Sequence, residues 1–168
     1  SEMCIRDRDG SVWEGITPSD PEGDGNPSAR YDVSMAYDSK RDRTVLFGGY
    51  DGDWKSDTWE WNGSSWALIT PTDPEGDGNP SARWANAIAY DSQREKIVMF
   101  GGNNNGNHLS DTWEWNGTSW ALITPADPEG DGNPSARSGP PLVYDAQRQK
   151  MVLYGGHTGG SNYASDTW

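Results

Sequence analysis

Short runs in which apolar and polar residues alternate recur along this chain, separated by segments rich in Gly, Asp and Asn. One group of four such runs covers residues 34–37, 44–47, 57–61 and 66–70. In the third run the two Trp side chains fall on one face, and Thr58 and Glu60 fall on the other, which is the period of two of a β-strand. No segment combines a helical period with capping residues. The pattern therefore predicts an all-β chain of short strands.

The third and fourth runs are joined by a tight-turn signal. Asn62-Gly63 separates them, and Asn116-Gly117 stands at the same place in the next copy. Asn-Gly between β-type segments predicts a two-residue hairpin, because both central residues of that turn need a positive φ. We therefore expect each third and fourth strand to pair as an antiparallel hairpin.

Three landmarks show that the whole group of runs is repeated. Tyr-Asp pairs recur at spacings of 53 and 54 residues, and a Gly-Gly pair and an Asp-Thr-Trp triplet keep step with them. They begin at Tyr37, Tyr90 and Tyr144, at Gly48, Gly101 and Gly155, and at Asp57, Asp111 and Asp166. A fixed period of this length indicates a repeat architecture, in which each unit buries its faces against its neighbours.

A four-stranded unit of about 50 residues, with Gly-Gly after the second strand and Trp in the fourth, resembles the kelch repeat of β-propellers. The closest likeness is the kelch-like type related to the central domain of galactose oxidase. The resemblance covers the chain from Gly10 onward. It implies a kelch-type β-propeller fragment of about three four-stranded antiparallel blades. It leaves function open, because propellers host unrelated activities.

The repeat register divides the chain into a tail, residues 1–8, and a partial propeller, residues 9–168. Within the latter we expect a fourth strand at 12–17, blades at 34–70 and 87–124, and a truncated blade at 141–168. The register calls for Asp-Thr-Trp-Glu-Trp at positions 4–8, where the chain has Cys-Ile-Arg-Asp-Arg. The tail resembles a translated sequencing adapter, so we interpret it as non-native. Because propellers close with four to eight blades, we expect the chain to be part of a larger protein.

Composition limits the classes of function. The net charge of −13 argues against nucleic acid as a partner, and no run approaches the roughly 18 apolar residues of a membrane span. The only cysteine, Cys4, lies in the tail. The copper site that a likeness to galactose oxidase would imply needs a Tyr–Cys crosslink and two His ligands, whereas His108 and His157 lie in dissimilar loops. No nucleophile motif appears, so we predict that the chain is not an enzyme.

Three acidic loops carry much of the charge. Residues 20–30 recur letter for letter at 73–83 and 127–137, each with three carboxylates and one Arg. Oxygen ligands at the first, third and fifth positions followed by Gly resemble the opening of an EF-hand calcium loop. The candidate ligands are Asp20, Glu22, Asp24, Asp73, Glu75, Asp77, Asp127, Glu129 and Asp131. No cofactor is certain, and calcium is the candidate.

The calcium pattern is incomplete at its twelfth position. The bidentate Glu expected there is replaced by Tyr31, Trp84 or Ser138. The alternative is a solvated acidic turn shaped by Gly and Pro, whose Arg bridges back to a carboxylate or a carbonyl. Both interpretations stay open at this point.

The loops after each Gly-Gly pair differ between copies, and we call residues 50–55, 103–108 and 157–163 the variable loops. Antiparallel strand order places them on the same face as the acidic loops. Exposed aromatic and amide side chains there suit a protein contact or stacking against a sugar, although ordinary polar loops are the alternative. The candidate ligand-binding residues are Tyr31, Tyr50, Trp54, Trp84, His108, His157 and Tyr163.

These features favour a binding or scaffold module of a larger kelch-repeat protein, extracellular or on the cell surface, that recognises protein or glycan through this face. The alternatives are a calcium-rigidified structural repeat and a non-catalytic remnant of a carbohydrate-active propeller enzyme. Because incomplete blades leave strand edges and faces open, we also expect self-association.

Overall fold

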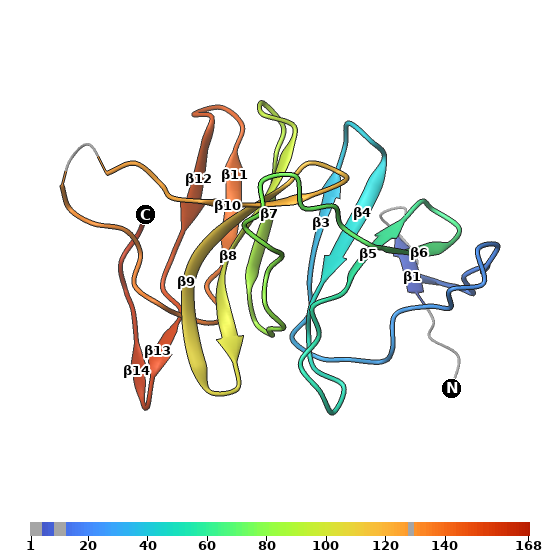
Figure 1. The fold of residues 1–168 in the computed structure, drawn as a ribbon, viewed down its shortest axis with the longest axis horizontal. Helices are drawn as coiled ribbons and strands as arrows, with labels where there is room; N and C mark the ends of the chain where they lie inside the picture. The colour runs from blue at the N-terminus through green and yellow to red at the C-terminus, as the bar shows by residue number, and fades with distance from the viewer. Residues whose placement is uncertain (1–4, 9–12, 128–129) are drawn as a thin grey trace.

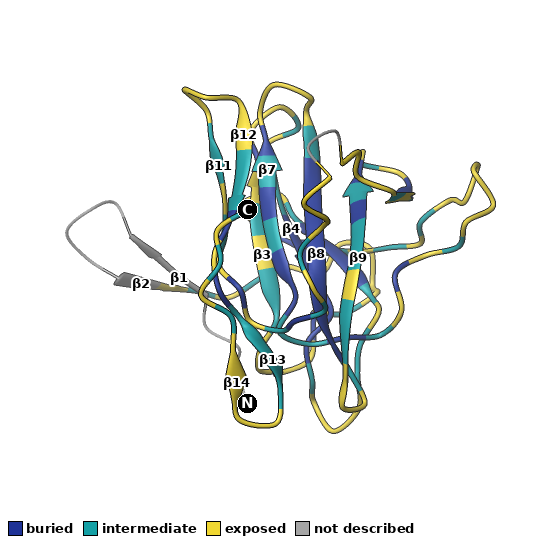
Figure 2. Cartoon of the chain, turned by 90° about the vertical axis from the view of Figure 1, so that its left-hand side faces the viewer, coloured by how far each residue is buried: buried dark blue, intermediate teal, exposed yellow. Residues whose placement is uncertain are grey.

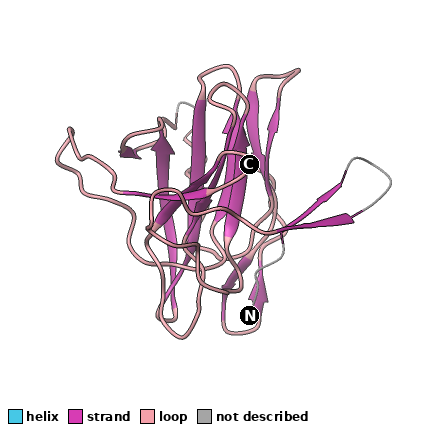
Figure 3. Ribbon diagram, turned by 90° about the vertical axis from the view of Figure 1, so that its right-hand side faces the viewer, coloured by secondary structure: helices cyan, strands magenta, loops and turns pink. Residues whose placement is uncertain are grey.

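The computed structural model describes residues 5–8, 13–127 and 130–168. Every regular element in these ranges is a β-strand, and the connections are turns and loops (Figure 3). The prediction of an all-β chain is confirmed. The described part of the chain contains no helix with the length and apolar character needed to span a bilayer.

Two sheets are complete antiparallel blades. The first blade contains β3 (Ser34–Asp38), β4 (Arg43–Phe47), β5 (Thr58–Trp61) and β6 (Trp66–Ile69). The second blade contains β7 (Ala87–Asp91), β8 (Lys96–Asn104), β9 (Asn107–Trp115) and β10 (Trp120–Ile123). In both, the strands are neighbours in chain order, and the blades stand side by side (Figure 1).

The remaining strands belong to partial blades at either side. The third blade contains β11 (Leu142–Asp145) and β12 (Lys150–Leu153), and a bridge joins Tyr154 to Thr167. Its variable loop forms a small hairpin of β13 (His157–Gly159) and β14 (Asn162–Tyr163). At the other side, β1 (Ile5–Arg8) pairs with β2 (Trp13–Ile16). The order of the sheets follows the order of the chain (Figure 1).

The β1–β2 hairpin keeps the register of a third and a fourth strand. Ile5 pairs with Ile16 as Thr58 pairs with Ile69, 53 residues later. The backbone of β1 therefore takes the third-strand position of the repeat, although its sequence departs from the repeat. Residues 1–4 and 9–12 lie outside the described ranges, and the non-native origin of residues 1–8 stays a prediction.

The core lies between blades and is made largely by second strands and Trp rings. Dark blue, fully buried positions dominate β8 in Figure 2. Trp120 of the second blade packs on Phe47 of the first, with ring centroids 5.3 Å apart, and its Nε1 donates to Thr58 Oγ1 at 3.0 Å. Trp115 Nε1 donates to Glu60 Oε1 at 3.1 Å in the same way. Large aromatic area and satisfied N–H groups therefore hold neighbouring blades together.

The double glycine allows the backbone that leads into the next blade to approach closely. Gly102 N donates to the carbonyl of Arg137 at 2.9 Å, and a Cβ on Gly101 would lie 2.6 Å from that oxygen. Gly101 and Gly102 also have φ of 62° and 106°, values that favour glycine. In the same manner, Gly49 N donates to the Arg83 carbonyl, with an N–O distance of 2.9 Å. The Gly pair is thus a latch between successive blades.

Candidate functional site

Each acidic loop ends in a buried arginine that anchors it to its own blade. The Arg83 side chain is 1% exposed, and Nη1 and Nη2 donate to the two Asp111 oxygens at 2.7 Å each. Its other N–H groups reach the Gly101 carbonyl at 3.0 Å, the Ser81 carbonyl at 3.0 Å and Ser81 Oγ at 3.1 Å. All five guanidinium donors are used. The same clamp joins Arg30 to Asp57 and Arg137 to Asp166.

The clamp keeps its carboxylates ionised. Burial alone raises the pKa of Asp111, but the hydrogen bonds and charge of Arg83, with a bond from Trp113 Nε1, outweigh burial and lower it. The pKa of Asp57 is lowered by the same balance, with Arg30 and Trp59 as donors. The arginine of the acidic loop therefore bridges to a carboxylate and a carbonyl, as the alternative to the calcium interpretation predicted.

The residue after each Arg pairs with the residue after each Gly-Gly. In the second blade, Trp84 and Asn103 exchange backbone hydrogen bonds of 3.1 and 2.9 Å. The corresponding bridges join Tyr31 to Tyr50 and Ser138 to His157. Acidic and variable loops therefore meet on one face, and every blade presents two side chains there from the same backbone frame.

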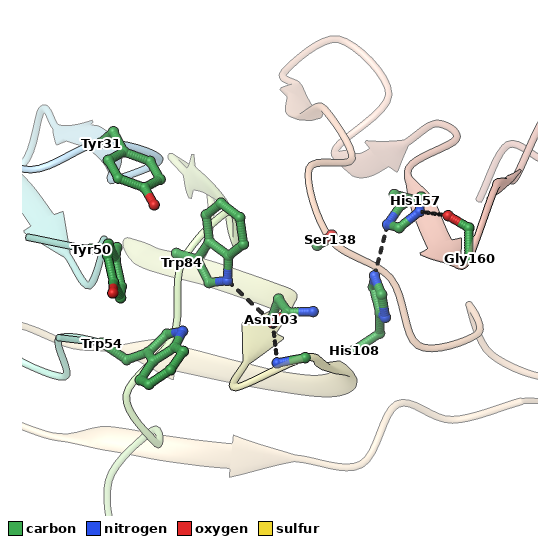
Figure 4. Close-up of a pocket in the computed structure, with 10 residues that line it drawn as sticks. Tyr31, Tyr50, Trp54, Trp84, Asn103, His108, Ser138, His157 and Gly160 are labelled. Atoms are coloured by element: carbon green, nitrogen blue, oxygen red, sulfur yellow. Dashed lines mark hydrogen bonds between the residues drawn. The ribbon is translucent and has the colours of Figure 1, made fainter. Parts of the chain in front are cut away.

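These side chains surround one cavity of about 560 Å³ (Figure 4). Its lining comprises Tyr31, Tyr50, Trp54, Trp84, Asn103, Gly106, His108, Ser138, His157 and Gly160. Six of the seven candidate ligand-binding residues are among them. Tyr163 is not: it is 77% exposed, and its ring packs beside His157 with centroids 5.1 Å apart. Ligand binding by these residues stays a prediction.

Asn103 and Ser138 are lining residues that the sequence reasoning did not name as candidates. A signal for them was present, because they occupy the repeat positions of Tyr50 and Trp84. The candidate residues were all aromatic or His side chains, so this amide and this hydroxyl were not among them.

One side of the cavity is a continuous series of aromatic rings. The centroid distance is 5.4 Å for Trp54–Tyr50, 5.4 Å for Tyr50–Tyr31 and 5.7 Å for Tyr31–Trp84. The interplanar angles are 67°, 54° and 87°, so the rings meet edge to face or tilted. Trp84 Nε1 donates to Asn103 Oδ1 at 3.2 Å, which fixes the last ring of the series.

The other side of the cavity carries a histidine pair. His108 Nε2 and His157 Nδ1 are 2.9 Å apart, and His157 Nε2 lies 3.0 Å from the Gly160 carbonyl. Because a carbonyl only accepts, His157 Nε2 carries the proton in its bond to Gly160. Burial, and then the neighbouring His157, lower the pKa of His108. His108 is therefore neutral at pH 7.

The carboxylates of the acidic loops face backbone N–H groups. Asp73 accepts from Gly76 N at 2.9 Å and from Gly78 N at 3.2 Å. Asp77 Oδ2 accepts from Leu122 N on β10 at 2.7 Å. The equivalent bonds join Asp20 to Gly23 and Gly25, Asp24 to Leu68, and Asp127 to Gly130 and Gly132. One carboxylate closes the turn, and another caps the outer strand of the next blade.

Glu22, Glu75 and Asp131 are exposed, and Glu129 lies outside the described residues. Within the described ranges, no group of three or more His, Cys, Asp or Glu side chains is placed to hold a metal ion. Calcium binding by the acidic loops stays a prediction.

Four-stranded blades, a Gly-Gly latch and a buried Arg–Asp clamp, all repeated in register, define a kelch-type β-propeller. The sequence model of the KLHDC2/KLHL20/DRC7 Kelch-repeats domain matches residues 3–168, and the chain belongs to this family. The resemblance to kelch repeats is thereby confirmed. Kelch-repeat domains generally serve as protein–protein interaction modules and are typically non-catalytic.

Proposed function

We propose that this chain binds a protein partner and that the cavity between the acidic and variable loops is its binding surface. The observation that carries the proposal is the contrast between backbone and side chains at the bridges. The backbone pairing is the same in each blade, whereas the side chains are Tyr31 and Tyr50, then Trp84 and Asn103, then Ser138 and His157. A constant frame with changing side chains is suited to recognising one specific partner.

The size and chemistry of the cavity support this proposal. A volume of about 560 Å³ is in the range of ligand-binding pockets. Tyr and Trp are enriched among the residues that dominate protein interfaces, because they bury large area with few rotatable bonds. Two Tyr and two Trp line this cavity.

We also propose that the cavity is not a catalytic site. The nitrogens of His108 and His157 that form hydrogen bonds in the described structure contact each other and a carbonyl, not the Ser138 or Tyr hydroxyls. A nucleophile would need a base within hydrogen-bond reach.

Affinity capture with matched variants tests the binding surface. Proteins retained by the wild-type chain should be lost when Trp54 and Trp84 are both replaced by Ala. The control is Tyr37→Ala, since Tyr37 is 53% exposed, is not among the cavity lining residues and bonds to Asp42. Mass spectrometry that finds the same proteins on wild type and on the double variant would show that the surface is wrong.

A glycan is the second candidate ligand, because aromatic faces beside the Asn103 amide suit stacking and hydrogen bonding to a sugar. A glycan array probed with the wild type and the Trp54/Trp84 double variant tests it. Signals that disappear in the double variant would favour the glycan, and a blank array would remove it.

A further inference from the structure

Resting on the proposed function, we propose that the partner inserts a cationic Lys or Arg side chain into the aromatic side of the cavity. The four rings of Tyr31, Tyr50, Trp54 and Trp84 line a common space (Figure 4). They come from two blades: Tyr31, Tyr50 and Trp54 from the loops of the first, and Trp84 from the loop leading into the second. Together they form a box of π-systems at one end of an open cavity.

Ring geometry favours a positive charge. Adjacent rings meet at 54° to 87°, so their faces point in different directions around the space that the four rings line. Aromatic faces carry the negative part of the ring quadrupole and attract ammonium and guanidinium groups within about 6 Å. Trp and Tyr are the strongest of these faces.

No Lys or Arg side chain of the described chain lines the cavity, so none competes for this box. His108 is neutral at pH 7 because burial and His157 lower its pKa. The nearest lysine in the variable loop, Lys55, is 2.9 Å from Asp51 Oδ1 and is held in that ion pair.

The surrounding charge also favours a cationic guest. Hydrogen bonds from Ser28 and Lys55 lower the pKa of Asp51 to about 2, so it is ionised at neutral pH. Asp53, next to Trp54, is exposed. With a net charge of −13 on the chain, the approach of a basic segment is favoured and that of an acidic segment is opposed.

The test compares a cation with its uncharged isostere. Choline and 3,3-dimethyl-1-butanol share one shape, but only choline carries a charge. In an NMR titration of the 168-residue chain, the choline N-methyl signal should move upfield through ring currents. Its binding should be roughly 5- to 30-fold tighter than that of the alcohol. Equal binding of the two compounds would overturn the inference.

Matched variants locate the effect. The Trp54→Ala/Trp84→Ala double variant should lose the choline shift, and Tyr37→Ala should keep it. A shift that survives in the double variant would place choline elsewhere and would overturn the inference.

Competition separates this inference from the proposed function. An octalysine peptide, but not octaglutamate, should displace from the chain those proteins whose capture depends on Trp54 and Trp84. If such proteins are captured but neither choline nor octalysine competes, the protein-binding surface stands and the cationic chemistry is wrong. If choline binds through the two Trp residues but no captured protein depends on them, the proposed function fails.

Discussion

The buried Arg83 fixes the position of the end of its acidic loop relative to two blades. Its guanidinium joins strand ends of its own blade, and its backbone carbonyl enters the Gly48-Gly49 latch of the preceding blade. A charged group at 1% exposure is stable in the fold because every donor has a partner. Arg137 has the same dual role, since its carbonyl accepts from Gly102 N and its guanidinium binds Asp166.

Replacing Arg83 with Met should strongly destabilise the chain. The change removes the Arg83 hydrogen bonds from Asp111 and from the Gly101 carbonyl and leaves Asp111 with the bond from Trp113 Nε1. Because Asp111 is partly exposed, we expect a loss of about 2 to 3 kcal/mol. The control is Arg94→Met, since Arg94 is 51% exposed in its ion pair with Asp91 and should cost no more than about 1 kcal/mol. Urea unfolding measures both, and equal losses would contradict the prediction.

The clamp carboxylates predict a pH dependence of stability. The pKa values of Asp57, Asp111 and Asp166 are lowered in the fold. Carboxylates of this kind stabilise the fold above their ordinary pKa of about 4, and the stabilisation is lost as pH falls through the lower folded values. The free energy of unfolding should therefore fall from about pH 5 downward.

Asp111→Asn provides the check on that assignment. The amide cannot titrate, so the variant should be less stable than wild type at pH 7, and the difference should shrink toward pH 3. Urea unfolding at several pH values measures this. A stability difference that is constant with pH would show that the Arg83–Asp111 pair is not the source of the pH dependence.

At the scale of strands, two equivalent fourth-strand Trp residues differ in one hydrogen bond. Trp66 is 3% exposed, and its Nε1 has no hydrogen-bond partner within the described structure. The equivalent Trp120 Nε1 donates to Thr58 Oγ1 of the preceding blade.

The acidic loops predict the outcome of a calcium titration. Because Asp73 and Asp77 already accept backbone N–H groups, the solvated-turn alternative predicts that millimolar calcium raises Tm no more than matched ionic strength does. A larger rise that disappears in the Asp24→Asn/Asp77→Asn/Asp131→Asn variant would support a calcium site. Magnesium serves as the second comparison, because it resists dehydration and demands octahedral geometry.

The strands and their repeat could be predicted from the sequence because alternation, Asn-Gly and the 53- to 54-residue period are local or periodic signals. Six candidate site residues were found for a related reason, since they interrupt the repeat on one face. The bond from Asp77 to Leu122 could not be predicted. It joins residues 45 apart, and only the stacking of blades brings them together. Tyr163 fits the same aromatic pattern but lies beyond the cavity, because its own hairpin carries it outward.

At the scale of the whole molecule, the interface of the second and third blades contains an apolar cavity of about 140 Å³. Phe100 and Thr112 line it. They match Phe47 and Thr58, which hold Trp120 one blade earlier. This cavity therefore corresponds to the site that receives a fourth-strand Trp one blade earlier.

We expect the 168-residue chain to self-associate, because such apolar sites and unpaired strand edges stabilise contacts with a second copy. Light scattering coupled to gel filtration should show a mass that increases with concentration. A sharp monomer peak at all concentrations, with cooperative unfolding, would contradict this expectation.

The Gly-Gly latch has a consequence for engineering longer or shorter versions of this propeller. The Arg83 carbonyl bonds to Gly49 of the first blade, and its guanidinium bonds to Asp111 of the second. An added blade must therefore include both the Arg and the groups to which that Arg bonds. A duplication whose boundary falls between Arg83 and Gly101 would separate Arg83 from its bonding partners in the same blade. A boundary at the exposed Gly76 falls instead in the turn of the acidic loop, before Arg83. The unit that can be added or removed therefore begins and ends in the acidic loops. Its boundaries do not coincide with those of a four-stranded blade.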